Sequence, residues 1–105
     1  MKGKKLRYSF EWDSVKAIRN LKKHVVSFEN AATVFLDPHA LTLFDTEHSR
    51  SKEDRWITLG VDQKGGLVIV CHTFWGKTDS SCKVRIFSAR KTTKSEAKQY
   101  KDSTT

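Results

Sequence analysis

Basic side chains from distant parts of the sequence are the first residues that could do chemistry. Arg85 and Arg90 lie near the end of an apolar, strand-like run. An arginine held by a sheet binds phosphate well, because it loses little rotamer freedom on binding. The other candidates for binding a phosphate group are Lys22, Lys23, Arg55 and Lys91. Each of these residues could instead be a solvated surface charge or one half of an ordinary ion pair.

Three further side chains could transfer protons at such a site. His24, at the end of a predicted helix, can titrate near neutral pH, although a histidine there could also bind free helix carbonyl groups. Glu53 is two residues before Arg55, so if the strand begins this early both share one face and either form a surface pair or serve one pocket. Tyr100 carries a phenol that could exchange a proton or pack in the core.

The remaining histidines and the cysteines give no sign of a metal or cofactor. Cys71 and Cys82 have neither CxxC spacing nor a wider Cys/His pattern, so buried or incidental thiols are favoured over a disulfide or a metal site. The other histidines, His39, His48 and His72, are scattered through different contexts. The sequence therefore predicts a site without a metal or other cofactor.

Strand periodicity separates the two arginines of the apolar run. In a regular strand, side chains alternate between faces. One face would hold Val84, Ile86 and Ser88, and the other Arg85, Phe87 and Ala89. Arg85 and Arg90 then point to opposite faces, because they are an odd number of residues apart. Both can serve one site only if the strand twists or breaks near Ser88 and Ala89.

The first half of the chain is predicted to form one strand and two helices. Residues 8–12 alternate between aromatic and polar side chains, as in a half-buried strand. Asp13 can cap a helix over residues 14–24, and Ser27 a second that ends at Asp37 and Pro38. The first helix is amphipathic, with a basic outer face opposite an apolar stripe. That stripe consists of Val15, Ile18 and Leu21.

The second half is predicted to form strands and one last helix. Strand patterns cover residues 41–44, 55–61, 67–75 and 83–89. Thr93 and Glu96 have the spacing of a capping box, which begins a helix with Ala97 and Tyr100 on one side. Helices grouped before an antiparallel meander indicate an α+β fold. A chain of 105 residues is expected to form a single domain, residues 1–105.

The charge of the chain suggests a polyanionic or acidic partner. The formal net charge is +8. Each end of the chain, residues 1–25 and 83–101, carries +6, whereas residues 26–82 carry −3. If the ends meet in the fold, they form one basic face, which attracts nucleic acid through counterion release. No apolar stretch approaches the roughly 20 residues that span a bilayer. We therefore expect a soluble intracellular protein with no membrane partner.

Several segments, in this order and spacing, resemble the BrnT family of type II toxins. They are FEWD (residues 10–13), KH followed by SFENA and FLDP (23–38), EDRW (53–56) and RIFSARK (85–91). The resemblance covers about residues 8–101. Two departures are Val25, where the family usually has glycine, and Thr92, where it usually has alanine.

The resemblance implies a RelE-like toxin fold, in which helices flank a small antiparallel sheet in the order β-α-α-β-β-β-β-α. It also implies a metal-independent ribonuclease toxin that inhibits translation and growth in the bacterial cytoplasm. Its expected partner is a BrnA-like ribbon-helix-helix antitoxin that forms a hetero-oligomer with the toxin. The complex would repress its own operon and bind operator DNA only through the antitoxin.

Such a toxin suggests how the candidate residues would cleave RNA. The 2′-hydroxyl attacks the adjacent phosphorus, which requires a base, cations around the phosphoryl oxygens and an acid for the leaving 5′-oxygen. Arg85 and Arg90 would bind the phosphate, supported by Lys23 and Arg55. Proton transfer falls to His24, Glu53 or Tyr100. Two alternatives remain open: a nucleic-acid-binding module without catalysis, and a basic surface that serves only an acidic partner protein.

Overall fold

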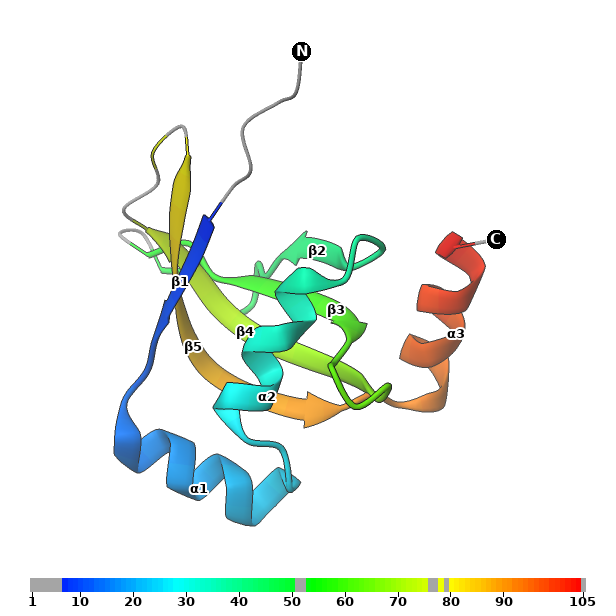
Figure 1. Ribbon diagram of the computed structural model, residues 1–105, viewed down its shortest axis with the longest axis horizontal. Helices are drawn as coiled ribbons and strands as arrows, with labels where there is room; N and C mark the ends of the chain where they lie inside the picture. Colours follow the sequence, from blue (N-terminus) through cyan, green and yellow to red (C-terminus); the bar gives the residue numbers. More distant parts are fainter. Residues whose placement is uncertain (1–6, 51–52, 76–77, 79, 105) are drawn as a thin grey trace.

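Within the described residues, 7–50, 53–75, 78 and 80–104, five strands form one sheet in a computed structural model of the chain (Figure 1). The strand order across the sheet is β1-β5-β4-β3-β2. In chain order the elements are β1 (Arg7–Glu11), α1 (Ser14–His24), α2 (Phe28–Ala32), the 3₁₀ helix η1 (Thr33–Leu36), β2 (Leu41–Phe44), β3 (Trp56–Val61), β4 (Leu67–Trp75), β5 (Ser81–Lys91) and α3 (Lys94–Thr104).

The predicted α+β class is confirmed, but the sheet is mixed rather than antiparallel. Strands β2 to β5 form an antiparallel meander, whereas β1 pairs in parallel with β5. Parallel neighbours cannot be joined by a hairpin, and here most of the domain lies between them in sequence. The pairing places the first strand of the chain beside the last one. Among the described residues, no helix has the length and apolar character needed to cross a membrane.

All three predicted helix N-caps are confirmed. The side chains of Asp13 and Ser27 accept hydrogen bonds from backbone N–H groups of α1 and α2. Thr93 and Glu96 form the capping box at the start of α3. The Glu96 carboxylate accepts from the Thr93 N–H at 2.8 Å, and the Thr93 hydroxyl accepts from the Glu96 N–H at 3.2 Å. These bonds satisfy backbone donors that a helix leaves unpaired at its start.

The predicted orientation of α1 is wrong. Its apolar residues Val15, Ile18 and Leu21 are 54%, 59% and 49% exposed. The face that packs on the sheet carries half-buried Ala17 and buried Asn20 instead. The reason is that α1 lies beside the β5 backbone, which requires a small residue and a hydrogen-bonding residue rather than an apolar stripe.

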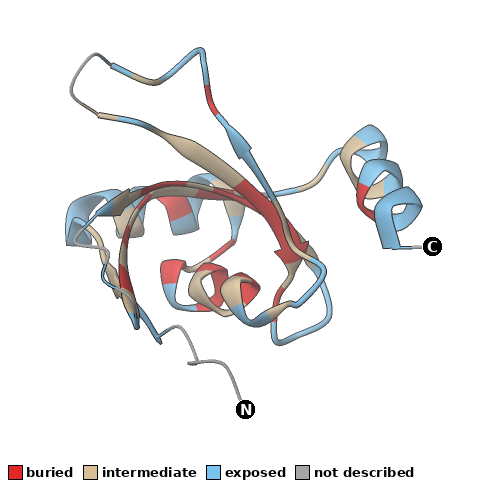
Figure 2. Ribbon diagram, turned by 90° about the horizontal axis from the view of Figure 1, so that it is seen from above, coloured by how far each residue is buried: buried red, intermediate tan, exposed pale blue. Residues whose placement is uncertain are grey.

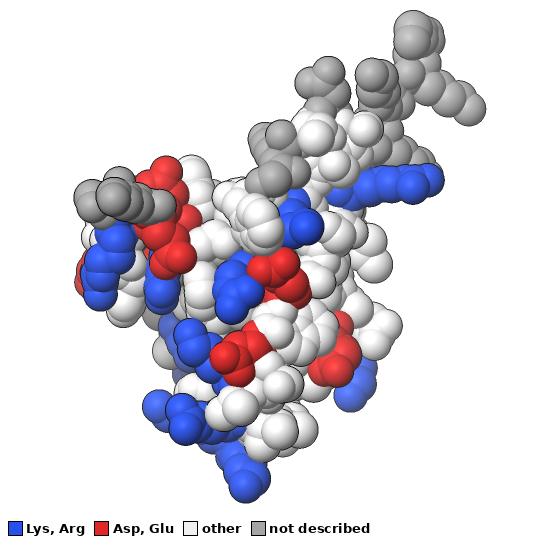
Figure 3. All heavy atoms as spheres, turned by 90° about the vertical axis from the view of Figure 1, so that its left-hand side faces the viewer, with Lys and Arg blue, Asp and Glu red and all other residues white. Residues whose placement is uncertain are grey.

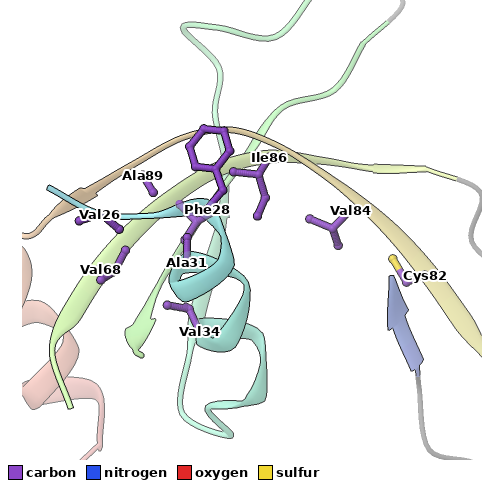
Figure 4. Close-up of a cluster of buried hydrophobic side chains, with 10 residues drawn as sticks. Val26, Phe28, Ala31, Val34, Val68, Cys82, Val84, Ile86 and Ala89 are labelled. Atoms are coloured by element: carbon purple, nitrogen blue, oxygen red, sulfur yellow. The ribbon is translucent and has the colours of Figure 1, made fainter. Parts of the chain in front are cut away.

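The main core lies between the sheet and the α2–η1 segment. Figure 2 shows the buried residues concentrated along the sheet and on α2 beside it. Phe28, Ala31 and Val34 come from the helical side. Figure 4 shows the cluster, which also contains Val26, Val68, Val70, Cys82, Val84, Ile86 and Ala89. A second, smaller cluster under α3 joins Leu59, Ile69 and Tyr100.

A β-bulge interrupts β5 near its middle. Cys71 of β4 pairs with Ser88, whereas the next β4 residue, His72, pairs with Ile86. β5 therefore contains one extra residue, Phe87, which reverses the alternation of faces. As a result Ala89 joins the core with Ile86, and Arg90 lies on the same face as Arg85. A twist or break near Ser88 and Ala89 was the condition for the two arginines to serve one site, and the strand is interrupted one residue earlier, at Phe87.

Val25 ends α1 in a left-handed conformation. Its φ is 59°, and its N–H donates to the carbonyl of Leu21 at 2.9 Å. Glycine adopts this conformation without steric cost, whereas a residue with a Cβ, above all a branched one, is strained there. The chain therefore keeps the glycine-type helix end at the cost of local strain.

Replacing Val25 by glycine should stabilise the protein. Val25 is 72% exposed, so little packing is lost, and relief of strain should outweigh the added chain entropy by about 1 kcal/mol. Urea unfolding measures the difference. The control Val15→Gly, in the first turn of α1, should lower the free energy of unfolding. A Val25→Gly variant no more stable than the parent would show that this helix end is unstrained.

His72 is buried at the centre of the sheet as a neutral ring. Its side chain is fully inaccessible, it packs against Phe35 and Phe74, and its Nε2 lies 2.7 Å from the hydroxyl of Thr58. Burial lowers the pKa of His72 from its ordinary 6.5 to about 4, because the charged form would lose its hydration. The ring is therefore a structural part of the core.

Protonation should couple the stability of the fold to pH through His72. Between pH 6.5 and 4 the unfolded chain binds a proton that the folded chain does not, so stability falls as the pH decreases. The full effect is about 3 kcal/mol. In His72→Gln the free energy of unfolding should change less across this window, whereas a variant at an exposed histidine, His39→Gln, should behave like the parent. Equal pH dependence of the His72 variant and the parent would contradict this assignment.

Candidate functional site

A cleft of about 530 Å³ opens beside the first half of β5. The Arg85 guanidinium donates to the Glu11 carboxylate at 2.7 Å, because Arg85 and Glu11 are paired residues of the parallel strands β5 and β1. Both side chains are partly exposed, so the pair is accessible to a ligand. The lining of the cleft consists of Glu11, Glu53, Asp54, Thr73, Phe74, Trp75 and Arg85.

Two cationic side chains lie over the ring of the bulge residue Phe87. The Arg55 guanidinium lies 4.1 Å from the ring centroid, and the Lys16 ammonium lies 5.3 Å from it. The Nε of Arg55 also donates to the Glu53 carboxylate at 3.0 Å. A guanidinium held by an aromatic face and a carboxylate keeps a defined position, so Arg55 is preorganised beside the cleft.

A second depression, of about 350 Å³, lies between α1 and the bulge of β5. His24 and Lys23, at the C-terminal end of α1, line it together with Ser88. Lys16 and Phe87 also line it. Arg55 links this groove with the cleft, because it lies over the Phe87 ring and donates to Glu53, which lines the cleft.

The Asn20 side chain fixes the groove by joining α1 to β5. Its amide nitrogen donates to the carbonyls of Ala89 at 2.8 Å and Val26 at 2.9 Å. Its amide oxygen accepts from the Ala89 N–H at 3.1 Å. Asn20 thus pairs with the β5 backbone beyond the end of β1, as a neighbouring strand would. These three bonds position the end of α1 against the bulge.

Arg90 is held at the start of α3 rather than in the cleft. Its guanidinium makes two parallel bonds to the Glu96 carboxylate, at 2.8 and 2.9 Å, and donates to the carbonyl of Lys91 at 3.2 Å. The hydrogen bond from Arg90 lowers the pKa of Glu96 to about 2, and Glu96 in turn raises the pKa of Arg90. Arg90 and Glu96 therefore brace the capping box of α3.

Tyr100 also belongs to the attachment of α3. Its hydroxyl donates to Asp37 at 2.5 Å, and the same carboxylate oxygen accepts from the Val61 N–H at 2.9 Å. Burial and the Asp37 carboxylate raise the pKa of Tyr100 to about 12, so the phenol stays protonated at neutral pH. The hydrogen bond from Tyr100 helps to lower the pKa of Asp37, although burial opposes it.

The structure brings together some of the predicted site residues and not others. Three of them, Glu53, Arg55 and Arg85, meet at the cleft or its rim, and two, Lys23 and His24, line the adjoining groove. Four lie outside both depressions, namely Lys22, Arg90, Lys91 and Tyr100. Sequence reasoning missed Glu11, Lys16 and Phe87 as site residues. The signal for Phe87 was present in its position between the two arginines.

Charge on this side of the molecule is uneven. In Figure 3, basic side chains gather toward the end of the molecule formed by α1, and acidic side chains are interspersed with basic ones above it. The sequence of α1 contains Lys16, Arg19, Lys22 and Lys23 and no acidic residue. Among the described residues, no group of three or more His, Cys, Asp or Glu could hold a metal ion.

Comparisons with known proteins agree on one family. Residues 12–96 match the family model described as "Ribonuclease toxin, BrnT, of type II toxin-antitoxin system". Among solved structures, the ribonuclease toxin BrnT of Brucella abortus is similar, with a TM-score of 0.54 and 17% sequence identity. The match covers 89% of this chain and 100% of that one, and at this identity it shows the fold. A search of curated proteins gave no match.

Removing the Asn20 amide should destabilise the fold. Asn20→Leu keeps the branched shape of the side chain but leaves three buried backbone groups without partners, which should lower the free energy of unfolding by about 3 kcal/mol. Denaturant unfolding measures the loss. The control Arg19→Leu, at the next, exposed position of α1, should change stability by less than about 0.5 kcal/mol. Similar small effects of both substitutions would show that α1 is held by other contacts.

Proposed function

Because this chain belongs to the BrnT family of ribonuclease toxins of type II toxin–antitoxin systems, we propose that it cleaves RNA at the cleft of Arg85 and the adjoining groove of His24. The family implies an antitoxin partner. The main support for the proposed site is the composition of the cleft. The cleft combines preorganised guanidinium groups with carboxylates and adjoins a groove lined by a lysine and a histidine.

Arg85 and Arg55 are assigned to the phosphate. Arg85 uses one guanidinium nitrogen for Glu11, which leaves other N–H groups for the phosphoryl oxygens. Arg55 is anchored by Glu53 and Phe87 and requires little reorganisation to bind an anion. Lys23 adds positive charge in the groove, where the next phosphate of an RNA strand would lie. These cations would stabilise the charge that develops on the phosphoryl group, without a metal ion.

Glu53 and His24 are assigned to proton transfer. One acts as the base that removes the proton of the 2′-hydroxyl while the 2′-oxygen forms a bond to phosphorus. The other acts as the acid that protonates the 5′-oxygen as the phosphorus–oxygen bond breaks. The products are a 2′,3′-cyclic phosphate and a 5′-hydroxyl. Glu53 lies at the cleft and His24 in the groove, so they approach the substrate from two sides.

The other predicted residues take supporting roles in this proposal. Arg90 acts through Glu96 to hold the end of β5 and the start of α3, and Tyr100 holds α3 through Asp37. Lys22 and Lys91 are exposed and add positive charge at the margin of the site.

The proposed partner is a ribbon-helix-helix antitoxin of the BrnA type, which forms a hetero-oligomer with this chain in the cytoplasm. The antitoxin would block the cleft and groove and would carry the complex to operator DNA. Repression of the shared operon would follow from that binding. Release of the toxin would inhibit translation and growth by removing intact RNA.

Replacing Arg85 by alanine should abolish cleavage while leaving the protein folded. We expect at least a 100-fold loss of rate, because a group that stabilises the transition state is removed. The assay incubates purified protein with total RNA in EDTA and identifies the new ends. Lys98→Ala makes the same charge change on the exposed surface of α3 and should leave the rate unchanged.

Two results would contradict this function. Full activity of Arg85→Ala at an unchanged melting temperature would remove Arg85 from the site. Intact RNA that still binds the parent protein with salt-dependent affinity would favour a nucleic-acid-binding module without catalysis.

A further inference from the structure

An apolar stripe on α1 has no counterpart within the described part of the chain. The stripe consists of Val15, Ile18, Leu21 and Val25, which are between 49% and 72% exposed. Their spacing of three or four residues aligns them along one side of the helix and its cap. Isolated apolar side chains are ordinary on a surface, whereas an aligned row is typical of an interface.

The stripe and the groove occupy different sides of α1. At 100° per residue, Ile18 and Leu21 lie on one side, Asn20 faces β5, and Lys16 and Lys23 lie on the side of the groove. Lys22 lies between Val15 and Ile18 on the stripe side, whereas Arg19 lies next to the stripe and also lines the groove. A ligand on the stripe would therefore reach Arg19 without covering the rest of the groove lining.

The positive charge of α1 favours a partner with acidic side chains. The helix contains four Lys and Arg residues and no Asp or Glu. A second copy packed on the same stripe would bring two sets of like charges together, which is unfavourable. A helix with an apolar seam and acidic flanks complements both features. The stripe contains no aromatic residue, which makes it less suited to a membrane interface, where Trp and Phe are typical.

We propose that the α1 stripe binds an acidic amphipathic helix of the antitoxin, an inference that rests on the toxin–antitoxin function proposed above. The apolar seam of that helix packs on Ile18 and Leu21, at the usual distance of helix pairs of about 8 to 10 Å. Its acidic side chains pair with Arg19 and Lys22 and extend toward Lys23. Neutralisation then has a physical basis, because the antitoxin pairs with Arg19 and reaches Lys23, two cations that line the groove proposed for RNA.

The test compares two substitutions of equal exposure and charge. Ile18 is 59% exposed on the stripe, and Leu43 is 60% exposed on β2. Calorimetric titration with the antitoxin encoded by the adjacent reading frame should give at least a 10-fold weaker affinity for Ile18→Asp. Leu43→Asp should bind like the parent. Arg19→Glu should weaken binding at low salt and approach the parent at high salt.

RNA cleavage is measured on the same variants without antitoxin. Ile18→Asp should retain the parent's rate, because Ile18 lies outside the cleft and groove. Unchanged antitoxin affinity in Ile18→Asp, or no complex with the parent, would overturn the inference. The inference would also be overturned if the protein self-associated in sedimentation through Ile18. Binding through Ile18 to vesicles of phosphatidylserine and phosphatidylcholine would overturn it as well. An inactive parent that binds antitoxin through Ile18 would overturn the proposed catalysis and support the α1 stripe.

Discussion

The buried amide of Asn20 is the interaction on which the rest of the site depends. Strand β1 pairs only with the first part of β5, and beyond its end the Asn20 side chain binds both the N–H and the carbonyl of Ala89. An amide can do this because it carries both a donor and an acceptor. Since Asn20 also binds the Val26 carbonyl, it fixes the turn after α1. The position of His24 and Lys23 relative to the bulge follows from these bonds.

Carboxylates hold the arginines of β5 in two distinct settings. Glu11 holds Arg85 at an open cleft, whereas Glu96 holds Arg90 with a bidentate geometry inside a helix cap. The bulge at Phe87 places both arginines on one face. Their carboxylate partners nevertheless hold Arg85 at the cleft and Arg90 at the start of α3. At about 3.3 Å per residue the two Cα atoms are roughly 15 Å apart, so they serve separate regions of that face.

Much of the fold could be predicted from the sequence, and part of the site could not. Asp13, Ser27 and the Thr93 and Glu96 pair are local signals, so the helix starts were predictable. The parallel pairing of β1 with β5 depends on contacts between distant segments. The pattern of residues within one segment does not predict which strand it pairs with. The orientation of α1 was predicted wrongly because its apolar stripe suggested a core face, whereas Asn20 packs against the sheet. The bulge was predicted only as a requirement for bringing Arg85 and Arg90 to one face.

The attachment of α3 has a consequence for the order in which parts of the molecule open. Figure 1 and Figure 2 show α3 at one side of the sheet, apart from the other helices. Its polar anchors are the carboxylates Asp37 and Glu96, and both have lowered pKa values, so acid removes the stability that they supply. Because α3 lies apart from the other helices and depends on these anchors, its amide hydrogens should exchange through a local opening before those of the central strands. The helix α3 would then behave as a separate cooperative unit.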